Sequence, residues 1–302
     1  MSDIRTNAPL AAAGLMLFGM AVIGLIDNYV VVIAEDASLW QFHAVRAMMA
    51  LPMMAALAAL GLGSLRAKRL RNVAIRSSLF GAAMLIYFGC LAFLPIAEVV
   101  AGLFSSPILV MVISALFLGK KVGWVRWSAG LVGFLGILLV LRPDTGSFTY
   151  LSFVPLGAAF LYALSALATR ELCEGEDTLT LLFWFFGILG VMGFVGLAVL
   201  TAFPQTVPEG PDGFILRGVT WPSGQFLFWT FVQAFASIIA VGCLTRGYQL
   251  GEASYVAVFE YSLMIFASFW AFMIRGDVPD TATYAGIALI IVSGAVIALR
   301  SR

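Results

Sequence analysis

Ten long apolar segments occupy almost the whole sequence, and they restrict the possible folds more than any other feature. They cover residues 10–33, 40–62, 76–94, 96–118, 123–141, 150–169, 179–202, 225–249, 252–274 and 281–299. Each comes close to the 20 or so residues that an apolar α-helix needs to cross the hydrocarbon core of a bilayer. The connections are too short for a soluble domain. The sequence therefore predicts an all-α membrane protein with ten transmembrane helices.

Composition and motifs exclude several classes of function. Hydrophobic residues make up 62% and charged residues 11%, whereas soluble domains have about 25% charged residues. A net charge of +1 on such a chain gives no reason to expect a nucleic-acid partner. The three scattered cysteines form neither a disulfide framework nor a metal motif, and GxxxxGK[ST] and HExxH are absent. We expect no cofactor, no metal and no enzymatic activity.

Two stretches, 94–142 and 250–302, share one plan: apolar helix, polar hinge, apolar helix, arginine. Their landmarks pair at nearly constant offsets: Glu98 with Glu252, Gly119 with Gly276, Gly136 with Gly294 and Arg142 with Arg300. Because each half holds five spans, equivalent helices enter the membrane from opposite sides. The sequence predicts a five-plus-five inverted repeat, residues 1–146 and 147–302. This arrangement lets one fold open alternately to each side around a midplane cavity.

Basic residues are distributed unequally between the two sides of the ten-span topology. One side would carry thirteen: Arg5, Arg66, Lys68, Arg69, Arg71, Arg76, Lys120, Lys121, Arg126, Arg170, Arg246, Arg300 and Arg302. The other would carry three, Arg142, Arg217 and Arg275, with Arg46 inside a helix. Loops rich in Lys and Arg stay in the cytoplasm. We expect both termini to be cytoplasmic in a multi-pass protein of the cell inner (plasma) membrane.

Ionisable residues within the apolar segments are candidates for gating or proton-linked roles. These are Asp27, His43, Arg46, Glu98, Glu252 and Glu260. Each costs about 2.5–3.5 kcal/mol or more at bilayer depth, so each should face a partner or water. Asp27, His43, Arg46 and Glu98 lie toward the outer ends of their helices, where Arg46 is expected to pair with Asp27 or Glu98.

Structural alternatives remain open for each of these residues. The Arg46 pair is either a gate or a salt bridge that holds helices together. His43 can pack at headgroup level without titrating. Glu98 and Glu252 either gate opposite mouths of the pathway or interact as first-turn carboxylates with helix N-termini. Glu260, about two turns deeper, lies either in a water-filled cavity or beside a buried structural partner.

Pro107 lies near the middle of the fourth apolar segment. A proline inside a helix removes one backbone hydrogen bond and clashes with the preceding turn. The freed carbonyl can open a polar site or act as a flexion point. We therefore predict helix flexion at Pro107.

Several motifs together resemble one transporter family. They are Arg46 near the start of the second helix, Pro107 in SSPILVMVISALFLGKK, and Phe259-Glu260-Tyr261 leading through Gly276 to GIALIIVSG. With ten spans in two halves, the chain resembles the EamA branch of the drug/metabolite transporter superfamily. More loosely, it resembles aromatic amino acid exporters of the YddG type. The resemblance favours a cavity lined by aromatic residues from several spans.

Hydroxyl and amide groups in those spans are the predicted substrate ligands. They are Asn28, Tyr87, Ser105, Ser106, Tyr162, Ser165, Gln233 and Tyr261. Aromatic faces favour flat apolar groups and cations, and the polar groups add hydrogen bonds to an amino or carboxylate group. Phosphorylated cargo is disfavoured, because Arg46 is the only basic residue expected well inside a span and phosphate usually requires several.

The resulting hypothesis is a secondary transporter, expected to be an exporter, for amphipathic metabolites such as aromatic or other bulky neutral amino acids. Hydrophobic drugs are the alternative cargo. An integral-membrane enzyme or lipid-handling protein using the buried carboxylates is the alternative class, which an inverted repeat disfavours. The expected partners are a small-molecule substrate and the bilayer. The protein is expected to be a monomer or a weak homodimer. Seven glycines in two of the spans have the spacing that lets helices approach closely, within one chain or between two: Gly130, Gly133, Gly136, Gly187, Gly190, Gly193 and Gly196.

Overall fold

The ten predicted spans are present in the computed structural model, which describes residues 8–91, 93–143, 149–208 and 210–300. Within these residues the regular structure is entirely helical. The observed helix ends lie within a few residues of the predicted ones, except in the third span. That helix begins at Leu70 instead of residue 76. The prediction of an all-α protein with ten membrane-spanning helices is confirmed.

The first half of the chain forms five spans. The first is a helix interrupted by a short 3₁₀ turn: α1 (Pro9–Ile26), η1 (Asp27–Tyr29) and α2 (Val30–Asp36). The others are α3 (Leu39–Ala59), α4 (Leu70–Cys90), the pair α5 (Ile96–Leu103) and α6 (Ser106–Leu116), and α7 (Trp124–Leu141).

The second half repeats this order. Its spans are η3 (Tyr150–Phe153) with α8 (Val154–Glu171), α9 (Thr178–Ala202), α10 (Gly224–Leu250), the series α11 (Ala253–Val256), η5 (Ala257–Tyr261) and α12 (Ser262–Arg275), and α13 (Thr281–Arg300). A short turn, η4 (Gly210–Gly213), lies in the connection between α9 and α10.

Polar residues cap several of these helices. Ser38, Asp177 and Ser223 each precede a helix, and their side chains accept hydrogen bonds from backbone N–H groups of its first turn. These caps satisfy donors that have no partner within the helix. Gly276 ends α12 in the left-handed conformation (φ 74°), which glycine adopts without steric cost. The caps therefore fix where these spans begin and end.

The fourth and ninth spans are both interrupted near their middle. In the fourth, α5 ends at Leu103 and α6 begins at Ser106, directly before Pro107. Flexion at this proline stays a prediction. In the ninth, the five residues of η5 form a 3₁₀ turn between α11 and α12. Ser105 and Ser262 occupy corresponding places, and each hydroxyl donates to the carbonyl three residues earlier (both 2.7 Å). The two halves therefore share the same discontinuity.

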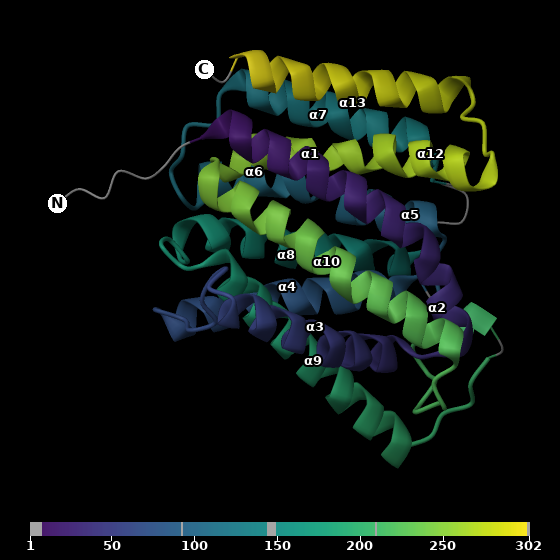
Figure 1. Ribbon diagram of the computed structural model, residues 1–302. Helices are drawn as coiled ribbons and strands as arrows, with labels where there is room; N and C mark the ends of the chain where they lie inside the picture. Colours follow the sequence, from purple (N-terminus) through teal and green to yellow (C-terminus); the bar gives the residue numbers. More distant parts are fainter. Residues whose placement is uncertain (1–7, 92, 144–148, 209, 301–302) are drawn as a thin grey trace.

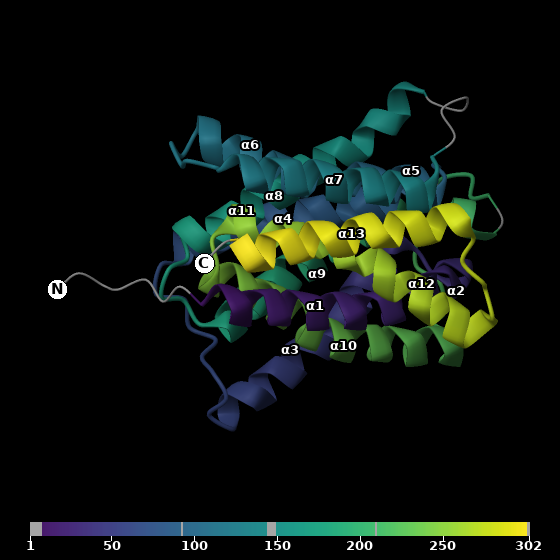
Figure 2. The same ribbon diagram turned by 90° about the horizontal axis from the view of Figure 1, so that it is seen from above.

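The most extensive helix pairings each join the first half to the second. They are α7 with α13, α1 with α10, α3 with α9 and α4 with α8 (Figures 1 and 2). Exchanging the halves converts α1 into α8 and α10 into α4, so the pairing of α1 with α10 becomes that of α8 with α4. The other two pairings map onto themselves. This is the arrangement expected of a five-plus-five inverted repeat.

Glycines allow the closest of these contacts. A Cβ atom on Gly193 of α9 would lie 2.7 Å from the backbone oxygen of Trp40 at the start of α3. A Cβ on Gly136 of α7 would lie 2.7 Å from the backbone oxygen of Gly286 in α13. Such approaches leave no space for a larger residue. The glycines at these positions serve packing within the chain.

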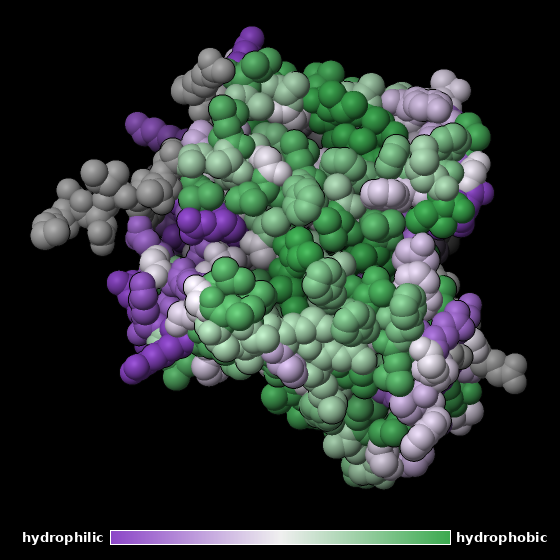
Figure 3. Space-filling view, in the orientation of Figure 1, coloured by the Kyte–Doolittle hydropathy of each residue, from purple (hydrophilic) through white to green (hydrophobic). Residues whose placement is uncertain are grey.

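The two ends of the bundle differ in charge. The start of α1 and the end of α13 lie at one end, with the loops 60–69, 117–123 and 172–177 (Figure 1). We call this the basic end. It carries exposed Arg66, Arg69 and Arg71, and hydrophilic side chains gather there (Figure 3). Arg5, Arg302 and the predicted boundary at 146/147 lie outside the described residues, and the cytoplasmic location of the termini stays a prediction.

Candidate functional site

A central cavity of about 120 Å³ lies inside the bundle and draws its walls from both halves. Aromatic rings form much of the wall. Phe80 and Phe185 stack with centroids 4.2 Å apart, and Tyr162 meets Phe80 edge-on at 5.4 Å. Phe186 continues this wall beside Phe185 (5.0 Å). Flat apolar groups pack well against such surfaces.

The interrupted spans supply polar groups to this cavity. Asp27 comes from η1, Ser106 from the start of α6, and Glu260 from η5. Backbone irregularity at membrane depth is tolerated where it lines a cavity, because polar groups there find partners or water. The three discontinuities therefore place acidic and hydroxyl groups in one site.

Glu260 both lines the cavity and makes two structural hydrogen bonds. It is 3% exposed, and its Oε1 accepts from the hydroxyls of Tyr162 (2.8 Å) and Tyr248 (2.5 Å). The structure thus combines the two alternatives for this residue. Tyr248 was not among the predicted substrate ligands. Its position on α10, a different span from Glu260, leaves no signal of this contact in sequence spacing.

Arg46 is buried in the same wall at 5% exposure. Its Nη2 lies 3.2 Å from His43 Nδ1, and its guanidinium stands over the rings of Phe42 (4.8 Å) and Phe186 (5.4 Å). Asp27 lines the same cavity, but no ion pair within 4.0 Å joins the two charges. Arg46 and Asp27 therefore line the same cavity without the direct salt bridge between them that the sequence suggested.

His43 is 1% exposed and packs against Phe42 and Phe88 at 5.0 and 5.4 Å. It lies in the interior of the bundle, and packing at headgroup level stays a prediction. Its Nε2 has no hydrogen-bond partner among the described atoms. His43 thus contacts Arg46 but does not itself line the cavity.

Glu98 and Glu252 lie at opposite ends of the bundle, as expected for equivalent positions of an inverted repeat, and neither lines the central cavity. Glu98, in the first turn of α5, accepts a hydrogen bond from Ser152 (2.9 Å). Glu252 precedes α11 and forms an ion pair with Arg126 of α7 (2.7 Å). Both carboxylates join neighbouring elements. These contacts favour the structural alternative, and a gating role stays a prediction.

Four predicted substrate ligands line the central cavity: Tyr87, Ser106, Tyr162 and Gln233. Gln233 of α10 donates to the carbonyl of Ile26, where α1 ends (2.8 Å). This bond holds α10 against the interruption in the first span. The structure therefore brings half of the predicted ligands together.

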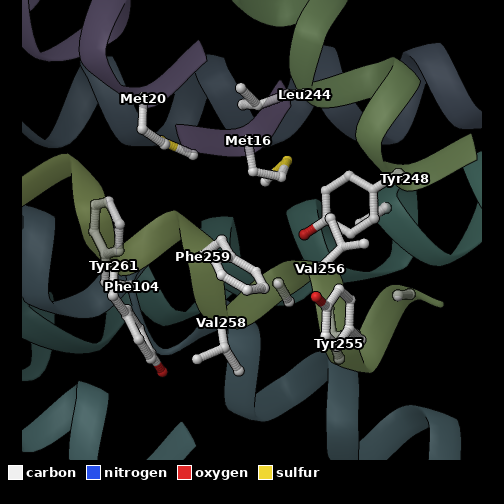
Figure 4. Packing of buried hydrophobic residues seen from close by; sticks show 14 of the residues in the cluster. Met16, Met20, Phe104, Leu244, Tyr248, Tyr255, Val256, Val258, Phe259 and Tyr261 are labelled. Atoms are coloured by element: carbon white, nitrogen blue, oxygen red, sulfur yellow. The ribbon is translucent and has the colours of Figure 1, made fainter. Parts of the chain in front are cut away.

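The other four predicted ligands lie elsewhere. Asn28 lines a second cavity and bonds to Arg275 (2.8 Å), and Ser165 lines a small pocket near the basic end. Ser105 donates only to the backbone. Tyr261 is 0% exposed and belongs to the buried apolar cluster that also holds Phe104 (Figure 4). Its ring packs on Gly133, outside the central cavity.

Larger cavities lie on either side of the central one. A cavity of about 670 Å³ extends toward the end opposite the basic end and shares Asp27, Tyr87, Phe88 and Leu263 with the central cavity. A cavity of about 850 Å³ opens at the basic end. The shared residues place the central cavity directly beside the first of these.

Arg76 lies in a small pocket on the other side of the central cavity, and it was not among the residues predicted for the site. It is 2% exposed, with Nε 2.9 Å from Thr169 Oγ1 and Nη2 3.0 Å from Thr245 Oγ1. The expectation that Arg46 is the only basic residue well inside a span was therefore wrong. A signal did exist: Arg76, Phe80 and Tyr87 are spaced to share one helical face.

No metal centre is apparent in the described part of the chain. Among those residues, no three His, Cys, Asp or Glu side chains are grouped so as to hold a metal ion. The central cavity instead offers aromatic rings, one guanidinium and two carboxylates. Such a set binds an organic ion by stacking, hydrogen bonding and charge.

Comparison with known proteins agrees with this architecture. The family model described as the EamA-like transporter family matches residues 10–142 and 149–299. A solved crystal structure matches with a TM-score of 0.74 at 18% identity, covering 98% of this chain and 99% of the other. At that identity it supports the fold alone.

Curated relatives are transporters with different cargoes. The riboflavin transporter of Vibrio cholerae is 27% identical over 206 residues, which cover 67% of this chain but only 62% of the relative. The pseudopaline exporter CntI of Pseudomonas aeruginosa is 29% identical over 70% of each chain. The S-adenosylmethionine uptake transporter of Rickettsia felis is 23% identical over 69% of this chain and 67% of the relative. Together with the family match, these similarities show that this multi-pass membrane protein belongs to the EamA-like transporter family.

Proposed function

We propose that this secondary transporter exports zwitterionic, amphipathic metabolites, with aromatic and other bulky neutral amino acids as its cargo. The observation that carries the proposal is the content of the central cavity. Aromatic walls enclose a buried guanidinium without a contact ion pair and two carboxylates, Asp27 and Glu260. Alternating access around this cavity follows from the inverted repeat.

Each part of an aromatic amino acid has a matching group in the cavity. The guanidinium of Arg46 suits a carboxylate, because it offers several charge-assisted donors in one plane. Asp27 and Glu260 are acceptors for an ammonium group. The rings of Phe80 and Phe185 offer faces for a flat side chain. A ligand with both charges and a ring thus satisfies groups that a purely apolar ligand leaves unpaired.

The charges of the cavity also favour amino acids over hydrophobic drugs. Burying an uncharged drug beside Arg46 and Asp27 would leave both charges without compensation. The relatives are named for three different cargoes, so they support transport of a small organic metabolite without choosing among candidates. The relative named an exporter is consistent with export.

We further propose that the basic end faces the cytoplasm. The exposed arginines of the loop 60–69 and of the start of α4 support this orientation through the preference of basic loops for the cytoplasmic side. Reporters fused after Arg302 and inserted in the loop 60–69 should both give cytoplasmic signals. An external signal from either fusion would contradict the orientation.

Transport is best tested with purified protein in liposomes. Vesicles loaded with unlabelled phenylalanine should accumulate labelled phenylalanine by counterflow. Phenethylamine, which lacks the carboxylate, and 3-phenylpropionate, which lacks the ammonium group, should each compete at least about tenfold more weakly, because each loses one charge-assisted contact of roughly 1.5–3 kcal/mol.

Arg46→Gln provides the structural test of the same proposal. It should abolish the preference for phenylalanine over phenethylamine, because the carboxylate loses its partner. Arg71→Gln removes the same charge from an exposed site on α4 and serves as the matched control. Absence of counterflow for every amino acid tested, or equal competition by all three compounds, would refute the proposed cargo. Outward transport in vesicles of known orientation tests the direction.

A further inference from the structure

Arg76 lies buried on the basic-end side of the central cavity, and the proposed function makes no use of it. Besides its bonds to Thr169 of α8 and Thr245 of α10, its Nη1 donates to the carbonyl of Leu181 in α9 (3.3 Å). Its guanidinium also stands over the ring of Phe80, 5.1 Å from the centroid. One side chain of α4 thus connects three other spans.

All three hydrogen-bond acceptors of Arg76 are neutral oxygens. The ion pairs of the described residues, such as that of Arg126 with Glu252, do not include Arg76. A buried guanidinium without a carboxylate is costly to maintain, because neutral acceptors compensate only part of its lost hydration. Packing alone would be served as well by an apolar side chain. The retained charge therefore points to a use in another state of the transporter.

The position of Arg76 makes it a barrier between two cavities. It lines a small pocket that shares Phe80 and Tyr162 with the central cavity and Thr169 with the cavity at the basic end. A substrate passing from one cavity to the other through this pocket crosses the layer formed by Arg76 and its partners. Opening the layer separates α4 from α8, α9 and α10, so the hydrogen bonds of Arg76 must break.

We propose that Arg76 closes the transport pathway at the basic end and receives the carboxylate of the substrate when this layer opens. The inference rests on the proposed function, because it requires a carboxylate-bearing cargo. A carboxylate replaces the hydroxyls of Thr169 and Thr245 with stronger, bidentate hydrogen bonds. The substrate carboxylate thereby pairs with the guanidinium of Arg76 when the hydrogen bonds that Arg76 makes in the closed state break.

Accessibility of Ser165 tests closure without any substrate. Ser165 is buried and lines the same small pocket. Ser165→Cys is made in a background whose native cysteines are replaced by serine: Cys90, Cys173 and Cys243. An impermeant maleimide is then applied from the basic end. Arg76→Ala should increase the labelling rate at least about tenfold relative to the parent, which corresponds to lowering the free energy of opening by roughly 1.4 kcal/mol. Arg71→Ala should leave the labelling rate unchanged.

A second pair of changes keeps the test decisive if Arg76→Ala does not insert into the membrane. Thr169→Val together with Thr245→Val retains the arginine and the side-chain shape but removes both hydroxyl acceptors. Labelling of Ser165→Cys from the basic end should rise in this variant as well. Unchanged labelling in every Arg76 and threonine variant that inserts would overturn the closure.

Transfer of the carboxylate is tested by comparing binding with transport. Arg76→Gln should bind phenylalanine with nearly wild-type affinity, because Arg46 remains, but lose most of its counterflow. Arg76→Lys should recover part of it. Loss of binding together with transport would place Arg76 in the central site and overturn the transfer. If wild type binds no phenylalanine, the proposed cargo fails, whereas the labelling of Ser165→Cys still decides whether Arg76 closes the pathway.

Discussion

Replacing Glu260 by glutamine separates its charge from its structural contacts. Both tyrosine hydroxyls, from Tyr162 and Tyr248, donate to the same oxygen, Oε1. A glutamine side chain retains an acceptor at that position and has nearly the same volume. Glu260→Gln should therefore keep the arrangement of η5, α8 and α10 while removing the negative charge from the cavity.

The expected effect follows from the contacts that the charge makes possible. A hydrogen bond to a charged group contributes roughly 1.5–3 kcal/mol, against about 1 kcal/mol between neutral groups. If the ammonium group of the substrate binds Glu260, the amide of Glu260→Gln keeps a neutral contact of about 1 kcal/mol. Substrate affinity should then fall by the difference of roughly 0.5–2 kcal/mol, which is about 2- to 30-fold. A proton exchanged at Glu260 would instead give a pH-dependent rate, and this dependence should disappear in the variant.

Transport in proteoliposomes over a pH series, with matched reconstitution, measures both effects. Glu35→Gln is the control, because it makes the same chemical change at an exposed position. A normal affinity, rate and pH profile in Glu260→Gln would refute a mechanistic role and leave Glu260 as a structural acceptor for two tyrosines. A wild-type protein without any pH response would favour facilitated diffusion over proton exchange.

Further expectations follow from packing and surface contacts. Tyr87→Ala should weaken phenylalanine binding by about 1 kcal/mol, which is roughly fivefold. Tyr261→Ala should lower stability by about 3–5 kcal/mol without changing the affinity of the folded protein for phenylalanine. Binding and unfolding assays in detergent measure the two effects. Gly193→Ala places a Cβ within 2.8 Å of backbone atoms of α3 and should destabilise the protein by about 1–3 kcal/mol. Gly187→Ala, with a nearest contact of 3.9 Å, should be neutral or stabilising by up to about 1 kcal/mol. Equal unfolding temperatures of the two variants would contradict the close approach of α9 to α3 at Gly193. A hydrogen bond from Arg142 holds the pKa of exposed Asp280 well below its usual range. The stability that ionised Asp280 contributes is present above the unfolded pKa of about 3.9 and is lost as pH falls through the lower folded pKa. The free energies of unfolding of Asp280→Asn and wild type should therefore differ by a constant amount from about pH 8 to about pH 5 and converge only in stronger acid.

The spans could be read from the sequence because the thickness of the hydrocarbon core demands a minimum length of apolar helix. The interruption of the fourth span was also predictable, since Pro107 cannot continue a helix without losing a hydrogen bond. The ninth span contains no proline, and its 3₁₀ turn has no comparable local signal. Only the correspondence of Ser262 with Ser105 in the repeat points to it.

The site was less predictable, because it depends on which face of each helix points inward. Glu260 lines the cavity, so Tyr261, about 120° further around the 3₁₀ turn, points elsewhere. Arg76 counts among the basic residues of the cytoplasmic side in the sequence prediction, because it is the first residue of the apolar segment 76–94. The helix in fact starts at Leu70, and its first turns carry polar residues into the bundle. Hydropathy locates the apolar part of a span but not the buried polar part that precedes it.

The pairing of helices across the two halves also constrains biogenesis. As the chain emerges from the ribosome, α1 enters the membrane long before α10, its main neighbour, has been synthesised. The same delay separates α3 from α9 and α7 from α13. The first half must therefore remain in the bilayer as inserted but loosely associated helices until the second arrives. Co-expressed as separate polypeptides, the two halves should assemble with each other, while either one alone should be a substrate for membrane proteases.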